Sequence, residues 1–158
     1  MNHLGRREAW FVTGSQHLYG DAALQEVAEH AREIARALCR SDELPVDIVF
    51  KPVLTTREAI HQLCQDANVA GDCIGLVVWM HTFSPAKMWI AGLNALQTPL
   101  VHFHTQVNRD IPWARIDMDF MNLNQSAHGG REFGFIGSRM RLSRKVIAGV
   151  WQNERVQA

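Results

Sequence analysis

The sequence predicts an α/β fold built on a mainly parallel sheet. Three observations lead to this class. Apolar segments of strand length alternate with amphipathic helical patterns, residues 73–80 ("CIGLVVWM") are apolar almost without interruption, and the chain has 158 residues, 47% of them hydrophobic. Alternating strands and helices are typical of right-handed parallel units, and an uninterrupted apolar strand is typical of a central strand covered on both faces. The length fits one domain with a sizeable core.

The strand and helix candidates follow one another in a regular order. In the first helix candidate, apolar residues recur at helical spacing from Leu24 to Leu38 with charged residues between them. Pro45 opens the second strand candidate, and short apolar segments mark the later strands. The expected elements are a strand at 8–12, a helix at 21–38, a strand at 46–53, a helix at 55–67, a strand at 73–80, a helix at 84–96, a strand at 99–104 and a strand at 145–150.

Residues that favour helix starts support three of these helices. Asp21 is the expected N-cap of the first helix. Thr55 and Glu58 have the spacing of a capping box at the start of the second. Ser84 and Pro85 have the pattern of an N-cap followed by the first helical position of the third.

The segment 117–141 allows two interpretations. If most of it is helical, a polar stripe and a smooth stripe of small residues lie on opposite sides. The polar stripe consists of Gln125, His128 and Glu132, and the smooth stripe of Ala127, Gly130, Gly134 and Gly137. Each glycine costs about 1 kcal/mol in a helix interior, so the smooth stripe would require close contact with another backbone, and the polar stripe would face a cavity or another subunit. Alternatively, the pair Gly129–Gly130 ends the helix.

Composition argues against several classes of function. Sixteen Lys and Arg balance sixteen Asp and Glu, so there is no net field to attract a nucleic acid. No segment approaches the roughly 18 apolar residues of a membrane span, and residues 1–12 lack the pattern of a cleavable leader. We therefore expect a soluble, cytoplasmic protein without nucleic-acid or membrane partners. The three cysteines indicate neither a disulfide framework nor a zinc site.

Polar and aromatic residues follow three of the predicted strands. These segments are 15–20 ("SQHLYG"), 81–87 ("HTFSPAK") and 104–106 ("HTQ"). Ligands of open parallel sheets bind outside the carboxyl ends of the strands, where these segments meet. Hydrogen-bonding groups beside an aromatic wall suit a small polyol or sugar. The alternative is that these loops are simply polar.

Other kinds of site have weaker support. The chain has neither a dinucleotide-binding nor a P-loop glycine motif, and the bulky residues 16–19 would obstruct a pyrophosphate, although a flavin mononucleotide site stays open. His102 and His104 share a strand face, but no carboxylate lies at a ligand-like spacing. No nucleophile motif and no general acid/base carboxylate pair are evident.

Four segments resemble the N-terminal region of bacterial L-arabinose isomerase. They are "WFVTGSQHLYG", "GLVVWMHTFSPAKMWI", "FHTQVN" and "IDMDFMNLNQSAHGGREFGFIGSRMR". The similarity runs from about residue 8 to residue 152 and corresponds to roughly the first third of the family's chain. Asn153 is the expected N-cap of a further helix, and the sequence stops about where that helix is expected to continue. The resemblance implies that residues 1–158 form a single α/β N-terminal domain and that the central and C-terminal catalytic domains are absent.

The resemblance also implies a fold and an activity. The fold is a Rossmann-like or flavodoxin-like three-layer sandwich with a mainly parallel five-stranded sheet, in a subunit that forms homo-oligomers. The complete enzyme converts L-arabinose to L-ribulose and D-galactose to D-tagatose with manganese. The family's metal ligands and acid/base glutamates correspond to positions beyond residue 158. No residue of this chain is therefore expected to be catalytic or to bind the metal, and the chain alone is expected to be inactive.

Six residues are expected to bind the sugar by the same resemblance. Three match positions near the substrate, and three match positions that reach the pocket of an adjacent subunit. The first three are Gln16, Leu18 and Tyr19, and the second three are Phe83, Gln125 and His128.

Two rival hypotheses remain at this stage. One is a shortened, independent isomerase with a rebuilt metal site. Its candidate ligands are His81, His102, His104, His128 and Glu132. The other is a purely structural α/β module.

Overall fold

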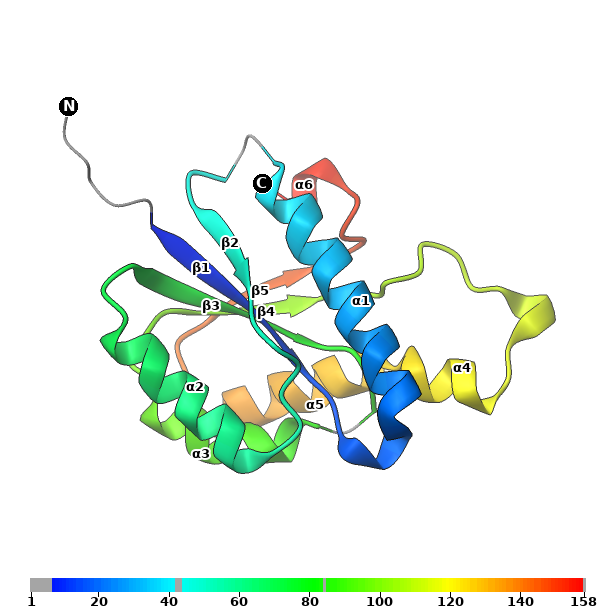
Figure 1. Ribbon diagram of the computed structural model, residues 1–158, viewed down its shortest axis with the longest axis horizontal. Helices are drawn as coiled ribbons and strands as arrows, with labels where there is room; N and C mark the ends of the chain where they lie inside the picture. The colour runs from blue at the N-terminus through cyan, green and yellow to red at the C-terminus, as the bar shows by residue number, and fades with distance from the viewer. Residues whose placement is uncertain (1–6, 42–43, 84, 158) are drawn as a thin grey trace.

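The computed structural model describes residues 7–41, 44–83 and 85–157. Its centre is a five-stranded sheet in which all neighbouring strands are parallel, in the order β2-β1-β3-β4-β5 (Figure 1). The strands are β1 (Glu8–Gly14), β2 (Asp47–Phe50), β3 (Cys73–Met80), β4 (Leu100–His104) and β5 (Lys145–Ala148). The predicted parallel, five-stranded α/β class is confirmed.

Helices cover both faces of the sheet. The α-helices are α1 (Gly20–Cys39), α2 (Arg57–Val69), α3 (Ile90–Ala95), α4 (Met118–Leu123), α5 (Ser126–Arg139) and α6 (Glu154–Gln157). Short 3₁₀ turns are η1 (His17–Tyr19), η2 (Ala86–Trp89) and η3 (Trp113–Arg115). Within the described ranges, no helix combines the length and the apolar character needed to cross a bilayer.

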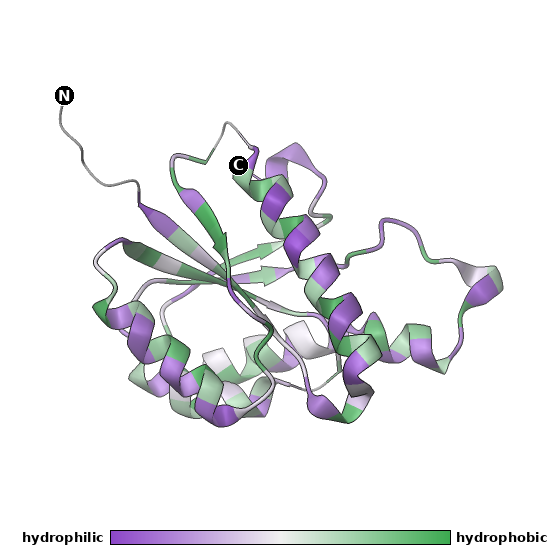
Figure 2. Ribbon diagram, in the orientation of Figure 1, coloured by the Kyte–Doolittle hydropathy of each residue, from purple (hydrophilic) through white to green (hydrophobic). Residues whose placement is uncertain are grey.

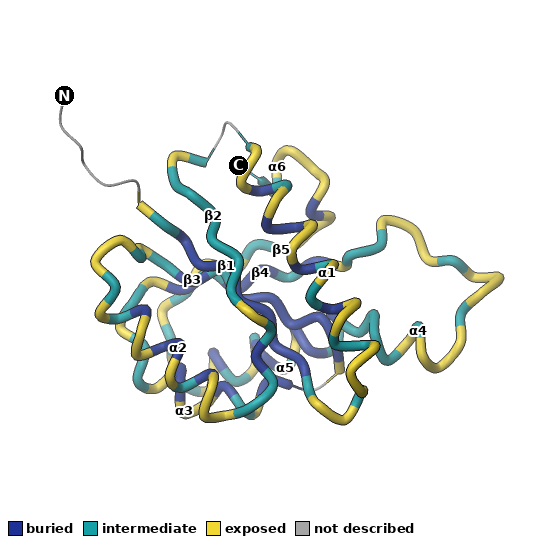
Figure 3. Tube along the Cα trace, in the orientation of Figure 1, coloured by how far each residue is buried: buried dark blue, intermediate teal, exposed yellow. Residues whose placement is uncertain are grey.

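Two hydrophobic cores lie on opposite faces of the sheet, and successive residues of the central strands enter them alternately. In β1, Val12 belongs to the same buried cluster as Ile60 of α2 and Phe133 of α5, whereas Phe11 belongs to the cluster that contains Ile34 of α1. In Figure 2 the strands are green over much of their length, and in Figure 3 the inner parts of β1, β3 and β4 are dark blue. Burial on both sides is the physical reason that these strands lack polar alternation.

The strand order reverses between β1 and β3, because β2 pairs with one edge of β1 and β3 with the other. In open α/β sheets, the crevice at such a reversal is the usual ligand position, beyond the carboxyl ends of the strands. The loops that leave β1 and β3 begin at this point. The fold therefore brings residues 15–19 and 81–83 together.

The structure corrects the expected helix starts. Asp21 lies in the first turn of α1 but is not its N-cap, because the helix begins at Gly20 directly after η1. Thr56, not Thr55, caps α2 by accepting a hydrogen bond from the backbone N–H of Ala59 at 3.2 Å. Ser84 lies outside the described residues. The helix expected at 84–96 consists of η2 followed by α3, with Pro85 just before η2.

Two strands are shorter than expected. β2 ends at Phe50. Beyond it, the N–H of Lys51 donates to the carbonyl of Phe11 at 2.9 Å, and an isolated bridge joins Leu54 to Gly14. β5 ends at Ala148, just before Gly149, whose φ is 151°.

The segment 117–141 forms two helices, and the break lies before the glycine pair. Asp117 caps α4 by accepting from the N–H of Phe120 at 2.8 Å, and α5 begins at Ser126. Gly129 and Gly130 both lie inside α5 and are buried. The interpretation in which this pair ends the helix is therefore wrong.

The smooth side of α5 faces the chain's own side chains. A Cβ placed on Gly130 would lie 2.7 Å from the His104 ring, and one on Gly137 would lie 2.9 Å from the Arg144 guanidinium. Gly134 lies opposite His102, while Ala127 is exposed. The expected contact with another backbone occurs instead at Gly129, where a Cβ would lie 2.5 Å from the carbonyl oxygen of Thr82.

Residues 107–123, here called the arm, connect β4 to the break before α5 and include η3 and α4. The arm extends away from the sheet in Figure 1, and much of it is exposed in Figure 3. Its return toward the body places α4 near the start of α1, beside the carboxyl edge of the sheet.

Candidate functional site

The loops that leave β1 and β3 are joined by hydrogen bonds at their first residues. The hydroxyl oxygens of Ser15 and Thr82 lie 3.0 Å apart, and both side chains are fully buried. The N–H of Ser15 also donates to the carbonyl of Leu54 at 3.0 Å. A buried hydroxyl pair of this kind satisfies two polar groups that would otherwise be costly to bury. The pair fixes where both loops begin.

Beyond this pair, two side chains of the first loop donate to one backbone oxygen of the second. The amide Nε2 of Gln16 lies 3.0 Å from the carbonyl oxygen of Phe83, and the hydroxyl of Tyr19 lies 2.9 Å from the same atom. Burial raises the pKa of Tyr19, and the charge of Glu132 raises it further. The phenol therefore remains protonated, and a donor, at neutral pH.

The Phe83 ring stacks on His128 of α5. Their ring centroids are 4.2 Å apart and the planes are inclined by 28°. Phe83 is 39% exposed, so one side of this aromatic pair is open to solvent. The stack joins the loop after β3 to the polar side of α5.

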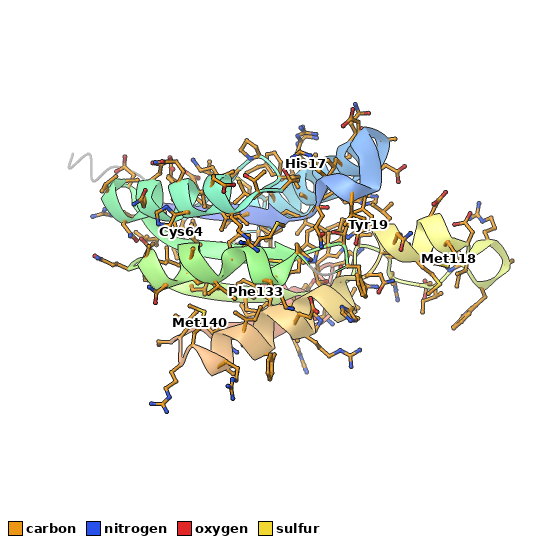
Figure 4. The ribbon with its side chains drawn as sticks, turned by 90° about the horizontal axis from the view of Figure 1, so that it is seen from below. His17, Tyr19, Cys64, Met118, Phe133 and Met140 are labelled. Atoms are coloured by element: carbon orange, nitrogen blue, oxygen red, sulfur yellow. The ribbon has the colours of Figure 1, made fainter. Side chains whose placement is uncertain are left out.

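Two cavities lie at this edge of the sheet. The first has a volume of about 930 Å³ and is bounded by the first loop, the start of α1 and the arm. Its lining residues are Gln16, Leu18, Tyr19, Ala22, Ala23, Glu26, Phe83, Arg115, Asp117, Asp119, Phe120, Asn122 and Leu123. Figure 4 shows Tyr19 at the start of α1, on the side toward α4, and Met118 farther out on the arm.

The second cavity, of about 830 Å³, lies between the arm, α5 and the end of β5 and is mainly apolar. Its lining includes His104, Gln106, Ile111, Trp113, Ile116, Phe120, Met121, Gln125, His128, Arg131 and Val150. The six expected sugar-binding residues are thus divided. Gln16, Leu18, Tyr19 and Phe83 line the first cavity, and Gln125 and His128 line the second.

Behind the site, two histidines form a hydrogen bond between α1 and the end of β3. Nδ1 of His30 lies 2.8 Å from Nε2 of His81, and the His81 ring stacks on Trp79 at 4.3 Å. Complete burial, together with the nearby His30, lowers the pKa of His81 to about 3. Both rings are therefore neutral at physiological pH, because burial also lowers the pKa of His30 against the opposing charges of Glu26, Glu33 and Glu29.

The described residues do not fit a divalent metal ion. Among residues 7–41, 44–83 and 85–157, no three His, Cys, Asp or Glu side chains are grouped so that they could hold one. The proposed ligands of a rebuilt site have other neighbours: His81 bonds to His30, His128 stacks on Phe83, and His102 stacks on His104. Burial lowers the pKa of His102 to about 4, with His104 and Arg144 contributing.

Sequence reasoning missed part of the site. His17 belongs to the polar loop, but its Nε2 lies 2.8 Å from Thr55 Oγ1, and it is absent from the lining of either cavity. The arm was not expected to contribute, yet Phe120 lines both cavities. A dense cluster of aromatic and apolar residues between a strand and a helix was the one available signal.

Comparisons with known proteins give matches over nearly the whole chain. The family model for the L-arabinose isomerase N-terminal domain matches residues 3–158. Proteins named L-arabinose isomerase from Koribacter versatilis, Herpetosiphon aurantiacus and Geobacillus thermodenitrificans are 69%, 64% and 61% identical to this chain over 153, 156 and 150 residues. These alignments cover 97%, 99% and 95% of the chain but only 31%, 31% and 30% of the relatives. The chain thus spans about a third of the length of the curated relatives it matches.

Proposed function

Because this chain belongs to the family of L-arabinose isomerase N-terminal domains, we propose that it supplies part of the sugar site and of the subunit contacts of a cytoplasmic isomerase. The complete enzyme would convert L-arabinose to L-ribulose and D-galactose to D-tagatose. One observation supports this most directly: Gln16, Tyr19 and Phe83 converge at the carboxyl ends of β1 and β3, beside a cavity of about 930 Å³.

The chemistry of the first cavity suits an uncharged, hydroxyl-rich ligand. Gln16 retains an amide oxygen that can accept from a sugar hydroxyl, and the exposed Leu18 side chain can pack against a sugar face. Small-molecule sites typically measure about 300–1,000 Å³ and combine apolar walls with a few placed polar groups. The volume and lining of this cavity support a monosaccharide.

Proton transfer, by contrast, has no candidate in this group. The pKa of Tyr19 is raised and its hydroxyl is already bonded to Phe83, so the phenol is a poor base. We assign the acid/base groups and the manganese ligands to the rest of the enzyme. There the metal would polarise the sugar oxygens. In this chain, Gln16, Leu18 and Tyr19 would orient the sugar.

Exposed apolar side chains on the arm support a role in homo-oligomer contacts. Trp113 is 80% exposed and Met118 is 66% exposed, with Ile111 and Met121 also exposed. Apolar side chains that gather on one projecting segment commonly mark interaction surfaces. We therefore include the arm in the proposed subunit interface.

The proposal is tested by titrating the ¹⁵N-labelled 158-residue chain with L-arabinose and L-arabitol while following its amide resonances. Shifts at Gln16, Leu18, Tyr19 and Phe83 are expected, and Leu18→Ala should weaken them. If the sugars move no resonance, the chain is a structural module only. An isomerase assay of the chain alone with manganese should give no turnover. Clear turnover, abolished by His104→Ala, would favour the stand-alone enzyme instead.

A further inference from the structure

We propose that Gln16 and Tyr19 are positioning residues for Phe83, and that they keep the two cavities separate by holding its backbone carbonyl. Both donate to this one oxygen, at 3.0 and 2.9 Å. We call these two hydrogen bonds the clamp. Side chains that only line a ligand site do not need a common acceptor. A shared backbone acceptor instead fixes the position of the residue that carries it.

The burial of the loop shows why Phe83 depends on the clamp. Thr82 is fully buried and bonded to Ser15, so the loop is anchored up to that residue. One residue later the chain reaches the surface, and 39% of Phe83 is exposed. Packing alone restrains an exposed side chain weakly, because it has few neighbours to displace. The hydrogen bonds from Gln16 and Tyr19 extend the anchor by one residue.

The position of Phe83 decides whether the two cavities are separated. Phe83 lines the first cavity and His128 lines the second, and their rings are stacked at 4.2 Å. The stacked pair therefore forms a wall between them. If the Phe83 backbone moves, the ring leaves His128 and this wall opens. Under the proposed function, on which this part rests, the clamp would thereby set the size of the sugar that fits the first cavity.

The clamp is tested by NMR of the 158-residue chain without sugar, reading the imidazole proton and carbon signals of His128. These signals report the ring current of Phe83. Phe83→Leu removes the aromatic ring and defines the positions of the unstacked state. In the double variant Gln16→Ala/Tyr19→Phe, which loses both donors, the His128 signals should move most of the way to those positions. Each single variant should move them less.

Thr55→Val is the matched control. It removes a side-chain hydrogen bond of the same loop region, to His17 at 2.8 Å, without touching Phe83. The His128 signals should stay at their wild-type positions in this variant. The indole N–H signal of Trp79, which donates to the Thr105 carbonyl at 2.9 Å, reports in every variant that the fold is intact. If the double variant keeps this signal and the His128 positions of the wild type, the clamp does not position Phe83 and the proposal is wrong.

The consequence for the sugar is measured separately in the complete enzyme. Gln16→Ala/Tyr19→Phe and Phe83→Leu should change the ratio of kcat/KM for L-arabinose to that for D-galactose in the same direction. A neutral hydrogen bond corresponds to a factor of about 5, so the loss of two allows a change of up to about 25-fold. A changed NMR signature with an unchanged ratio would confirm the clamp and contradict the sugar site. An unchanged NMR signature contradicts the clamp whatever the ratio.

Discussion

Nδ1 of His30 and Nε2 of His81 lie 2.8 Å apart and connect α1 to the last residues before the Thr82–Phe83 loop. The His81 ring is fully buried and stacked on Trp79, whereas His30 is half-buried on α1. Only one of the two nitrogens can carry the shared proton. Each imidazole carries one ring proton when neutral, and a further proton would place a charge against the fully buried His81 ring, so burial favours the neutral state of both imidazoles.

The first prediction concerns pH and stability. The pKa of His81 is about 3 in the fold and 6.5 in the unfolded chain, so only the unfolded chain takes up this proton between those values. The contribution of His81 to stability is complete above pH 6.5 and is lost as the pH falls toward 3. Between pH 6.5 and pH 3, each fall of one pH unit should therefore lower the free energy of unfolding of the wild type by about 1.4 kcal/mol more than that of His81→Gln.

Urea denaturation at a series of pH values measures this difference. His61→Gln, in α2 on the opposite face of the sheet, is the control for replacing a histidine outside the buried pair. Equal slopes for wild type and His81→Gln would show that the buried pair does not govern the acid sensitivity of the fold.

The second prediction concerns the glycines of α5. A Cβ at Gly129 would lie 2.5 Å from the backbone oxygen of Thr82, so Gly129→Ala should destabilise the chain by about 2 kcal/mol. Gly134 is the matched control. Its Cβ would lie 3.4 Å from the His102 ring, an ordinary contact, and alanine is favoured in a helix by about 1 kcal/mol. Gly134→Ala should therefore be neutral or stabilising in thermal unfolding, and a loss as large as that of Gly129→Ala would refute the packing argument.

The third prediction separates binding from stability at Leu18. This side chain is 70% exposed, so Leu18→Ala should change the free energy of unfolding by no more than about 0.5 kcal/mol. The sugar affinity of the Leu18→Ala variant, measured by the NMR titration, should nevertheless fall. Val27→Ala, on the buried side of α1, should show the reverse. It should lower the free energy of unfolding by about 2 kcal/mol, and the folded variant should keep the sugar affinity of the wild type. Unchanged affinity in Leu18→Ala would remove this residue from the proposed site.

The fourth prediction concerns the arm. Trp113→Ser should lower the mass of the complete enzyme in sedimentation velocity, because the proposed interface loses an exposed aromatic side chain. Val69 at the end of α2 is 84% exposed and serves as the control, since Val69→Ser removes a similarly exposed apolar side chain outside the arm. If both variants assemble like wild type, Trp113 does not belong to the interface.

The sheet could be predicted because its signal is local. Each buried strand is an apolar segment of sufficient length, and β3 shows this most clearly. Helix starts were less predictable, because a contact with a residue far away in the sequence can decide which of two neighbouring residues caps the helix. Thr55 matches the capping pattern, but its hydroxyl is bonded to His17, and Thr56 caps α2. α5 continues through Gly129 because the helix backbone approaches Thr82 closely at this point, and helix propensity alone does not predict such a tertiary contact.

The site was predictable in part for the same reason. Parallel strands end at one edge, so the convergence of residues 15–19 with Phe83 follows from the strand pattern. The hydrogen bonds between them do not, because the acceptor is a backbone carbonyl and the sequence gives no indication of which one is available. The division of the site into two cavities depends on the arm, whose residues show no helical or strand periodicity up to η3.

The carbonyl held by Gln16 and Tyr19 belongs to the main chain, and every amino acid at position 83 would offer the same oxygen. These two hydrogen bonds are therefore independent of the side chain at position 83. Under the proposed function, replacing Phe83 by another aromatic or aliphatic residue would alter the surface that meets the ligand, while the carbonyl held by Gln16 and Tyr19 would stay in place. Under that function, a change of ligand preference at position 83 would require one substitution and no change in its anchor.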